Sequence, residues 1–172
     1  MSALTIAAIY FGSFLAIGVI ARSVVRRWLN LRDIDHVVLR VRDIEAMTRF
    51  YCDVLGASKV AYRPEFGMTH LRVGGSMIDL VAVDGPLGKP GGAAPGKEGR
   101  NMDHLCLRVD PFDQDAIVAH LKEHDVTVGE IRARFGAEGT GVSIYLTDPE
   151  GNTVELKGPS DGASKPRSTV KS

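Results

Sequence analysis

The sequence predicts an α+β protein in which two tandem βαβββ modules form a curved mixed/antiparallel sheet cup, preceded by an N-terminal transmembrane helix. Three observations lead to this fold class. The seven residues at 35–41 return at 103–109 with five identical positions. A similar order of strand-like and helix-like segments follows each copy. An uncharged apolar run at 3–21 precedes both copies.

The apolar run at 3–21 is long enough, as a helix, to cross the hydrocarbon core of a bilayer. Arg22, Arg26 and Arg27 follow it, and basic residues beside an apolar span usually stay on the cytoplasmic side. We therefore expect residues 1–29 to be a single-pass membrane anchor and its basic flank, with the folded domain in the cytoplasm. A targeting peptide and an ordinary packed helix are the alternatives.

The rest of the chain divides by composition. The predicted folded domain covers 30–158, with one module at 33–84 and the second at 101–158. Residues 85–100 are rich in glycine and proline, which is typical of a flexible linker. Residues 159–172 offer almost no apolar side chains to bury, so they are expected to form a disordered tail.

The first module begins with alternating side chains at 34–41, and a period of two predicts a strand. Asp43 is the expected N-cap of the following helix, and Gly56 its C-terminal stop. Three further strands are expected at 58–62, 68–73 and 77–83.

The second module repeats this order. A strand is expected at 102–109 and a helix at 113–124. Strands at 126–133, 141–146 and 153–157 complete it. The segment 148–152 reads as a turn because proline fixes φ and glycine accepts positive φ.

Bulk composition excludes some classes of protein. Lys plus Arg and Asp plus Glu both count 21, so the net charge is zero and nucleic acid is not an expected partner. Cys52 and Cys106 have no CxxC spacing. Both are expected to be free thiols that pack in the core as small apolar side chains.

Each module opens with a histidine on its first strand and closes with a carboxylate on its last. These residues are His36 and Asp79 in the first module, and His104 and Glu155 in the second. Imidazole and carboxylate groups are ligands of Zn, Fe, Ni and Mn. The helices need the Val and Leu faces of the strands, so the histidines are expected on the opposite, concave face. The repeat therefore predicts a site for one divalent metal ion built from two half-sites.

Two segments resemble the vicinal oxygen chelate superfamily, which includes glyoxalase I, extradiol dioxygenases and fosfomycin-resistance thiol transferases. They are 34–56, with its strand histidine and Phe-Tyr…Leu-Gly helix end, and the last hairpin at 145–156. The segment 136–145 is similar to the glyoxalase-domain-containing subgroup. The resemblance spans about residues 33–158. It implies the same four metal ligands that the repeat indicates.

Asp79 departs from the resemblance, because glyoxalase I usually has Glu or Gln at this position. An aspartate is one methylene shorter, so direct ligation, a contact through water and pairing with a neighbouring arginine all remain open. Without it, His36, His104 and Glu155 make the two-His-one-carboxylate set of non-haem Fe(II) oxygenases.

Three further residues are candidates for substrate binding. Arg40 and Arg108 share the concave face with the ligands, where they would bind an anionic substrate or neutralise the ligand carboxylates. His70 is expected on the third strand, as a substrate contact or proton shuttle, or as an ordinary surface histidine.

The function that the resemblance implies is a glyoxalase-like lyase or isomerase acting on a small oxygen-chelating substrate, such as a thiol hemithioacetal. The metal would be a Lewis acid, and Glu155 or Asp79 the base. One alternative is an extradiol-type dioxygenase, and another is a non-catalytic module that binds drugs or other small molecules. A homodimer is expected because such short module pairs often complete their sites with a second copy.

Overall fold

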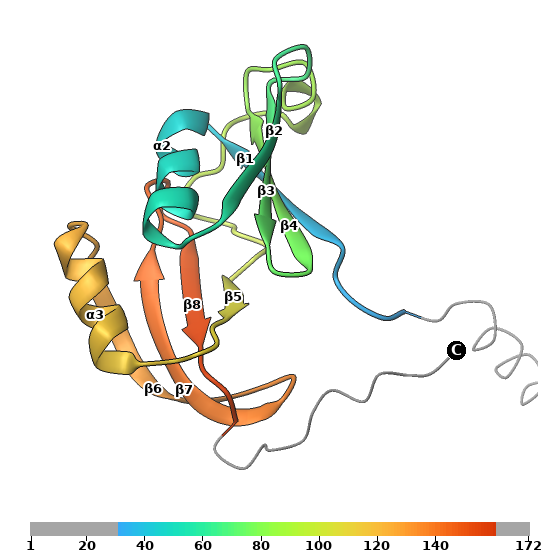
Figure 1. The fold of residues 1–172 in the computed structure, drawn as a ribbon. Coiled ribbons are helices and arrows are strands. Elements are labelled where there is room, and N and C mark those ends of the chain that lie inside the picture. Colours follow the sequence, from blue (N-terminus) through green and yellow to red (C-terminus); the bar gives the residue numbers. More distant parts are fainter. Residues whose placement is uncertain (1–30, 161–172) are drawn as a thin grey trace, which may run out of the picture. The chain divides into compact units, whose positions relative to one another are not determined.

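Two four-stranded sheets, one in each module, organise the computed structural model, which describes residues 31–160 (Figure 1). The first module contains β1 (His36–Val41), α2 (Ile44–Arg49), a π-helical turn η1 (Phe50–Val54), β2 (Ser58–Arg63), β3 (Met68–Val73) and β4 (Ser76–Ala82). After a short 3-10 turn η2 (Lys89–Gly91), the second contains β5 (His104–Arg108), α3 (Gln114–Glu123), β6 (Val128–Gly136), β7 (Gly139–Thr147) and β8 (Thr153–Lys157). The βαβββ order is present in both.

The strand order is the same in the two sheets. It is β1-β4-β3-β2 in the first and β5-β8-β7-β6 in the second. The first and last strands of each module pair in parallel, and the other neighbours are antiparallel. The histidine-bearing strands β1 and β5 are therefore edge strands of their sheets.

Two parts of the predicted fold class are corrected. The strands form two separate four-stranded sheets rather than one curved sheet cup. Within residues 31–160 there is also no helix with the length and apolar character needed to cross a membrane. The expected transmembrane helix, with the membrane localisation that depended on it, is therefore not supported. The apolar run at 3–21 that suggested it lies outside the described residues, as does the predicted tail beyond 160.

The helix ends follow the local sequence. The Asp43 carboxylate accepts a hydrogen bond from the Ala46 N–H at 2.8 Å, which satisfies a donor that the first helical turn leaves free. Asp113 does the same for Ala116 at 3.0 Å. Gly56 ends the first helix with a φ of +76°, which glycine adopts without steric cost.

One hydrophobic core cluster contains buried residues from the helices and sheets of both modules. In Figure 1, α2 lies along the first sheet, where it contacts β3 and β4, and α3 contacts β6. In the first module, buried side chains from alternate strand positions meet buried residues of α2 and η1. They are Leu39, Val41, Leu71, Ile78, Leu80, Met47, Phe50 and Tyr51. The alternation leaves His36, Val38 and Arg40 on the other face of the sheet, as predicted.

The two modules are joined by hydrogen bonds between α2 or η1 and the second module. The Tyr51 hydroxyl donates to a carboxylate oxygen of Asp148 at 3.2 Å, inside the core. Glu150 accepts from the Asp43 N–H at 2.8 Å, and His120 Nε2 bonds the Val54 carbonyl at 2.9 Å.

Candidate functional site

The module-1 cluster consists of His36, His70 and Asp79. In the strand register, Asp79 of β4 stands between Val38 of β1 and His70 of β3, on the face away from α2. Asp79 is buried, and its carboxylate lies 2.7 Å from His70 Nδ1. His36 is half exposed at the sheet edge. The expected carboxylate and both histidines of this module therefore share one face.

The module-2 cluster consists of His104, Ser143, Tyr145 and Glu155. Glu155 is 4% exposed at the centre of the second sheet, between β5 and β7. Its carboxylate accepts from the Ser143 hydroxyl at 2.5 Å and from the Tyr145 hydroxyl at 3.0 Å. His104 Nε2 lies 3.0 Å from the same carboxylate. Side chains of the neighbouring strands thus bind both oxygens of the Glu155 carboxylate.

These contacts determine the electrostatics of the module-2 cluster. Burial by itself would raise the pKa of Glu155, but the hydrogen bonds from Ser143 and Tyr145 and the charge of His104 outweigh it. The pKa of Glu155 therefore lies below its ordinary value, and the group is ionised at neutral pH. Partial burial of its thiol and the nearby charge of Glu155 raise the pKa of Cys106 to about 11.

A matched Asp–His pair supports each cluster. His36 Nδ1 lies 2.7 Å from the carboxylate of Asp35, and His104 Nδ1 lies 2.8 Å from that of Asp103. The bond to Asp35 raises the pKa of His36, with a smaller contribution from the charge of Asp79. A carboxylate on one ring nitrogen orients the other nitrogen, as is common for metal-binding histidines. The sequence reasoning missed this role, although the repeated Asp-His dipeptide carried the signal.

The predicted substrate arginines are engaged with the protein itself. The Arg40 guanidinium donates to the carbonyls of Gly88, Gly91 and Gly92 at 3.1, 2.9 and 2.7 Å. Arg108 forms an ion pair with Glu138 at 2.8 Å. Their assignment to substrate stays a prediction. Arg40 has the additional role of fixing the Gly/Pro segment that was expected to be a flexible linker.

The cysteines differ from expectation in one respect. Within residues 31–160, both are free thiols, as predicted. Cys52 is partly buried, whereas Cys106 is exposed on the same sheet face as Glu155 instead of packing in the core.

The four predicted metal ligands have the right chemistry for a divalent ion, since they offer two imidazoles and two carboxylates. Within residues 31–160, however, no group of three His, Cys, Asp or Glu side chains is placed to hold a metal ion. The predicted ligands occur as two partial sets, one on each sheet. Their assignment to a metal therefore stays a prediction.

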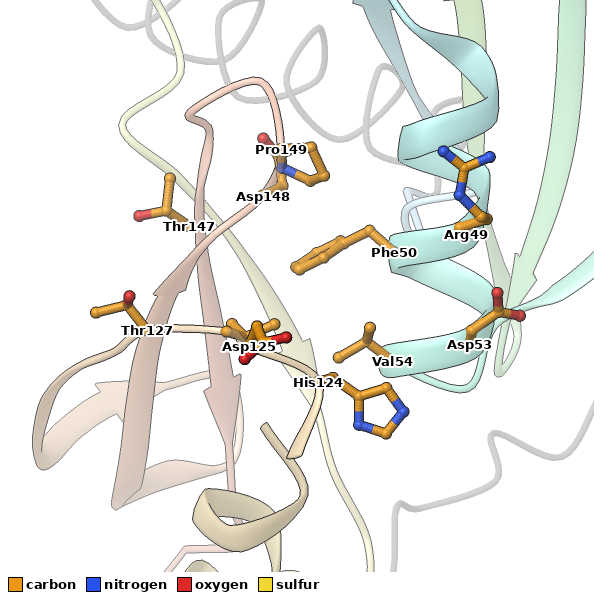
Figure 2. Close-up of a pocket in the computed structure, with 11 residues that line it drawn as sticks. Arg49, Phe50, Asp53, Val54, His124, Asp125, Thr127, Thr147, Asp148 and Pro149 are labelled. Carbon is orange, nitrogen blue, oxygen red and sulfur yellow. The ribbon is translucent and has the colours of Figure 1, made fainter. Parts of the chain in front are cut away.

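A pocket of about 490 Å³ lies at the junction of the modules, apart from the predicted site residues (Figure 2). Arg49, Phe50, Asp53 and Val54 of α2 and η1 form one side. The segment 124–127 after α3 and the turn at 147–149 form the other. The pocket contains none of the residues singled out by the repeat.

Known proteins resemble this chain in both sequence and fold. Mitochondrial methylmalonyl-CoA epimerase of Mus musculus is 31% identical over 133 residues, which cover 74% of each chain. Virulence protein STM3117 of Salmonella typhimurium is 32% identical over 128 residues, covering 72% of this chain and 81% of that protein. Its crystal structure matches with a TM-score of 0.62 and 26% identity, over 76% of this chain and 99% of that one.

An antibiotic binding protein, TnmS3 from Streptomyces sp. CB03234, matches with a TM-score of 0.56 and 27% identity, over 77% of this chain and 99% of that one. The family model described as Glyoxalase/Bleomycin resistance protein/Dioxygenase superfamily matches residues 33–156, which confirms the resemblance seen in segments 34–56 and 145–156. With this match and with relatives above 30% identity, the chain belongs to that superfamily.

Proposed function

We propose that this protein is a divalent-metal-dependent enzyme of the glyoxalase type, which moves a proton at a carbon beside a carbonyl group. The observation that carries the proposal is the pairing of Glu155 with His104, backed by Asp103. A buried, ionised carboxylate beside an imidazole that is oriented by a second carboxylate suits both metal binding and proton transfer.

In this proposal, His36, Asp79, His104 and Glu155 would hold the ion. A bound ion would supply Lewis-acid chemistry that polarises the substrate. Glu155, or Asp79, accepts the proton from the substrate carbon and returns it. Ser143 and Tyr145 hold Glu155 in place, and His70 does the same for Asp79.

The relative named an epimerase supports proton transfer as the reaction class. Epimerisation of a carbon beside a thioester carbonyl requires that a proton is removed and then replaced. Conversion of a hemithioacetal to a thioester also moves a proton between adjacent carbons. A thiol hemithioacetal and an acyl thioester are therefore the first two substrates to test.

We further propose that the two clusters form one site across a homodimer. β1 and β5, which carry His36 and His104, are edge strands, and the free edge of a strand can pair with another strand. Pairing of β1 in one copy with β5 in a second would bring the module-1 cluster beside the module-2 cluster. This arrangement would supply the third and fourth ligands that either cluster lacks by itself.

Metal content of the purified full-length protein tests the metal site. We expect about one Zn, Ni, Co, Fe or Mn ion per chain by mass spectrometry, and loss of the ion in His104→Ala. The matched control is His124→Ala, at the residue that follows α3 and lies outside both clusters. Absence of bound metal after reconstitution would overturn the proposal.

A mixing experiment tests the shared site. His36→Ala and His104→Ala chains each lack one half-site, so neither binds metal alone. If the site is shared, a mixed dimer contains one intact site, and co-refolding the two variants restores part of the metal content. If each chain builds its own site, the mixture binds as little metal as the separate variants.

Turnover tests the reaction. The protein is incubated in D₂O with methylmalonyl-CoA, or with the hemithioacetal of methylglyoxal and glutathione. Deuterium incorporation from solvent beside the carbonyl, lost in Glu155→Gln, is the expected result. Oxygen consumption with a catechol instead would identify a dioxygenase, and binding without turnover would identify a ligand-binding module like TnmS3.

A further inference from the structure

Two buried hydroxyl groups without partners line one cavity of the first module. Within residues 31–160, Thr48 Oγ1 and Thr69 Oγ1 are the buried side-chain polar atoms that form no hydrogen bond. Both residues border a cavity of about 690 Å³ beside α2, β2 and β3. This cavity lies on the helix side of the sheet, so it is separate from the His36 and Asp79 face.

The position of Thr69 makes its hydroxyl unusual. Thr69 is fully buried on β3, where the neighbouring position on the same face is Leu71 and the facing residue on β4 is Leu80. A buried hydroxyl with no partner costs free energy, and valine would fill the same space without that cost. A hydroxyl here is favourable if it bonds a ligand.

Charge and an aromatic ring meet at the mouth of the same cavity. Lys59 and Tyr62 of β2 line it, with Lys59 Nζ 5.5 Å from the centre of the Tyr62 ring. Tyr62 is 52% exposed. Lys59 forms no ion pair with any described residue, whereas Arg42 and Arg49 of the same lining pair with Glu150 and Glu45. Two carboxylates also line the cavity, but Asp43 accepts from the Ala46 N–H and Glu45 pairs with Arg49. Lys59 is thus the charged group of the lining that remains for an incoming anion.

We infer that this cavity binds a small hydroxylated aromatic carboxylate. The inner hydroxyl of the ligand hydrogen-bonds to Thr48 and Thr69, its ring packs beside Tyr62, and its carboxylate pairs with Lys59. The cavity volume is in the usual range for sites that enclose small organic molecules. No part of this argument depends on a metal ion or on the proposed enzymatic reaction.

The test compares 4-hydroxybenzoate with benzoate, which lacks only the hydroxyl group. Binding to the full-length protein is followed by calorimetry and by amide chemical shifts around Thr69. Because benzoate forms no hydrogen bond to either threonine hydroxyl, we expect it to bind at least about tenfold more weakly. Thr69→Val leaves only the Thr48 hydroxyl, so it should reduce this preference, and Lys59→Gln should weaken both compounds.

Matched controls are Thr127→Val and Lys122→Gln, which alter exposed residues outside this cavity. His104→Ala must leave binding unchanged, which separates this site from the proposed metal site. Since the Thr69 hydroxyl has no partner, Thr69→Val should melt no lower than the wild-type protein without ligand. Thr69→Ser, which keeps the hydroxyl, should keep the preference. Absence of 4-hydroxybenzoate binding, or equal preference in wild type and Thr69→Val, would overturn the inference.

Discussion

At the scale of single residues, Glu155 is the buried carboxylate on which three side chains of the second sheet converge. Its carboxylate accepts from Ser143 and Tyr145 and lies beside His104. These neighbours keep it ionised although it is buried, because they replace the water that burial removes. A carboxylate prepared in this way is ready to bind a cation or to accept a proton.

Removing the Ser143 hydroxyl should destabilise this carboxylate. We expect Ser143→Ala to lower the free energy of unfolding by about 1–3 kcal/mol at neutral pH, because a buried charged acceptor loses its donor. The pKa of Glu155 lies below its ordinary value near 4.5, so the ionised group stabilises the fold above that pH. This stabilisation is lost as the pH falls through the folded-state pKa. Ser143→Ala should raise that pKa, so that less stabilisation is lost on acidification and the loss is complete at a higher pH.

Urea unfolding of the metal-free protein from neutral pH to about pH 3 measures both effects. Ser58→Ala, an exposed serine on β2, is the matched control and should change neither. Identical pH dependence in Ser143→Ala and Ser58→Ala would contradict the role assigned to Ser143.

Cys106 should be a slow nucleophile. With a pKa of about 11, only about one thiol in a thousand is ionised at pH 8, and the thiolate is the reactive form. In a Cys52→Ser background, we expect alkylation by iodoacetamide to be far slower than that of free cysteine. Glu155→Gln should accelerate it, because the nearby negative charge contributes to the raised pKa. An equal rate with and without Glu155 would contradict this coupling.

At the scale of elements, the Gly/Pro segment after β4 is fixed by a side chain of β1. Arg40 donates to three glycine carbonyls of this segment, and Gly91 allows the guanidinium to approach. A Cβ on Gly91 would lie 2.5 Å from the Arg40 guanidinium carbon, so the two cannot coexist in this arrangement. An arginine on the predicted concave face therefore organises the connection between the modules.

Gly91→Ala should release this connection. We expect amide hydrogen exchange across η2 to accelerate about tenfold or more, because the segment loses its anchors to Arg40. Gly96→Ala is the matched control, since a Cβ there meets nothing within 4 Å. Unchanged exchange in Gly91→Ala, measured by mass spectrometry, would show that Arg40 does not hold the segment.

At the scale of the whole described unit, the junction between the modules contains a buried hydrogen bond from Tyr51 to Asp148. Asp148 also accepts from the backbone N–H groups of Glu150 and Asn152, so it links the turn before β8 to the helix of the other module. Burial raises the pKa of Tyr51 above its ordinary value, and the phenol remains a donor. The two modules are thus expected to unfold together.

Tyr51→Phe removes the hydroxyl and leaves Asp148 with one donor fewer. We expect a loss of about 1–3 kcal/mol in the free energy of unfolding. Tyr62→Phe, which alters a half-exposed tyrosine, is the control and should have little effect. Chemical denaturation, monitored by a signal from each module, measures the free energy of unfolding of both variants. Equal stability of Tyr51→Phe and Tyr62→Phe would contradict the role of this bond.

Local patterns in the sequence predicted much of the fold. The strands at 68–73 and 153–157 are found at the predicted residues, and Asp43 caps the first helix as expected. The prediction that His36 and Arg40 lie on the same face of their strand was also correct, because the side chains of a strand alternate between its faces whatever its neighbours are. The repeat of His and carboxylate positions, and the family it indicated, likewise depend only on the order of residues.

The tertiary structure decided what lies next to these residues. Packing divided the strands into two four-stranded sheets. It also brought Arg40 to the glycine carbonyls and placed the Ser143 and Tyr145 hydroxyls beside Glu155. These contacts join residues that are far apart in the chain or on different strands. The unpaired hydroxyls of Thr48 and Thr69 belong to the same class, because only packing shows which polar atoms lack partners. Periodicity determines the side of an element on which a residue lies, whereas its contacts depend on long-range packing that no local pattern contains.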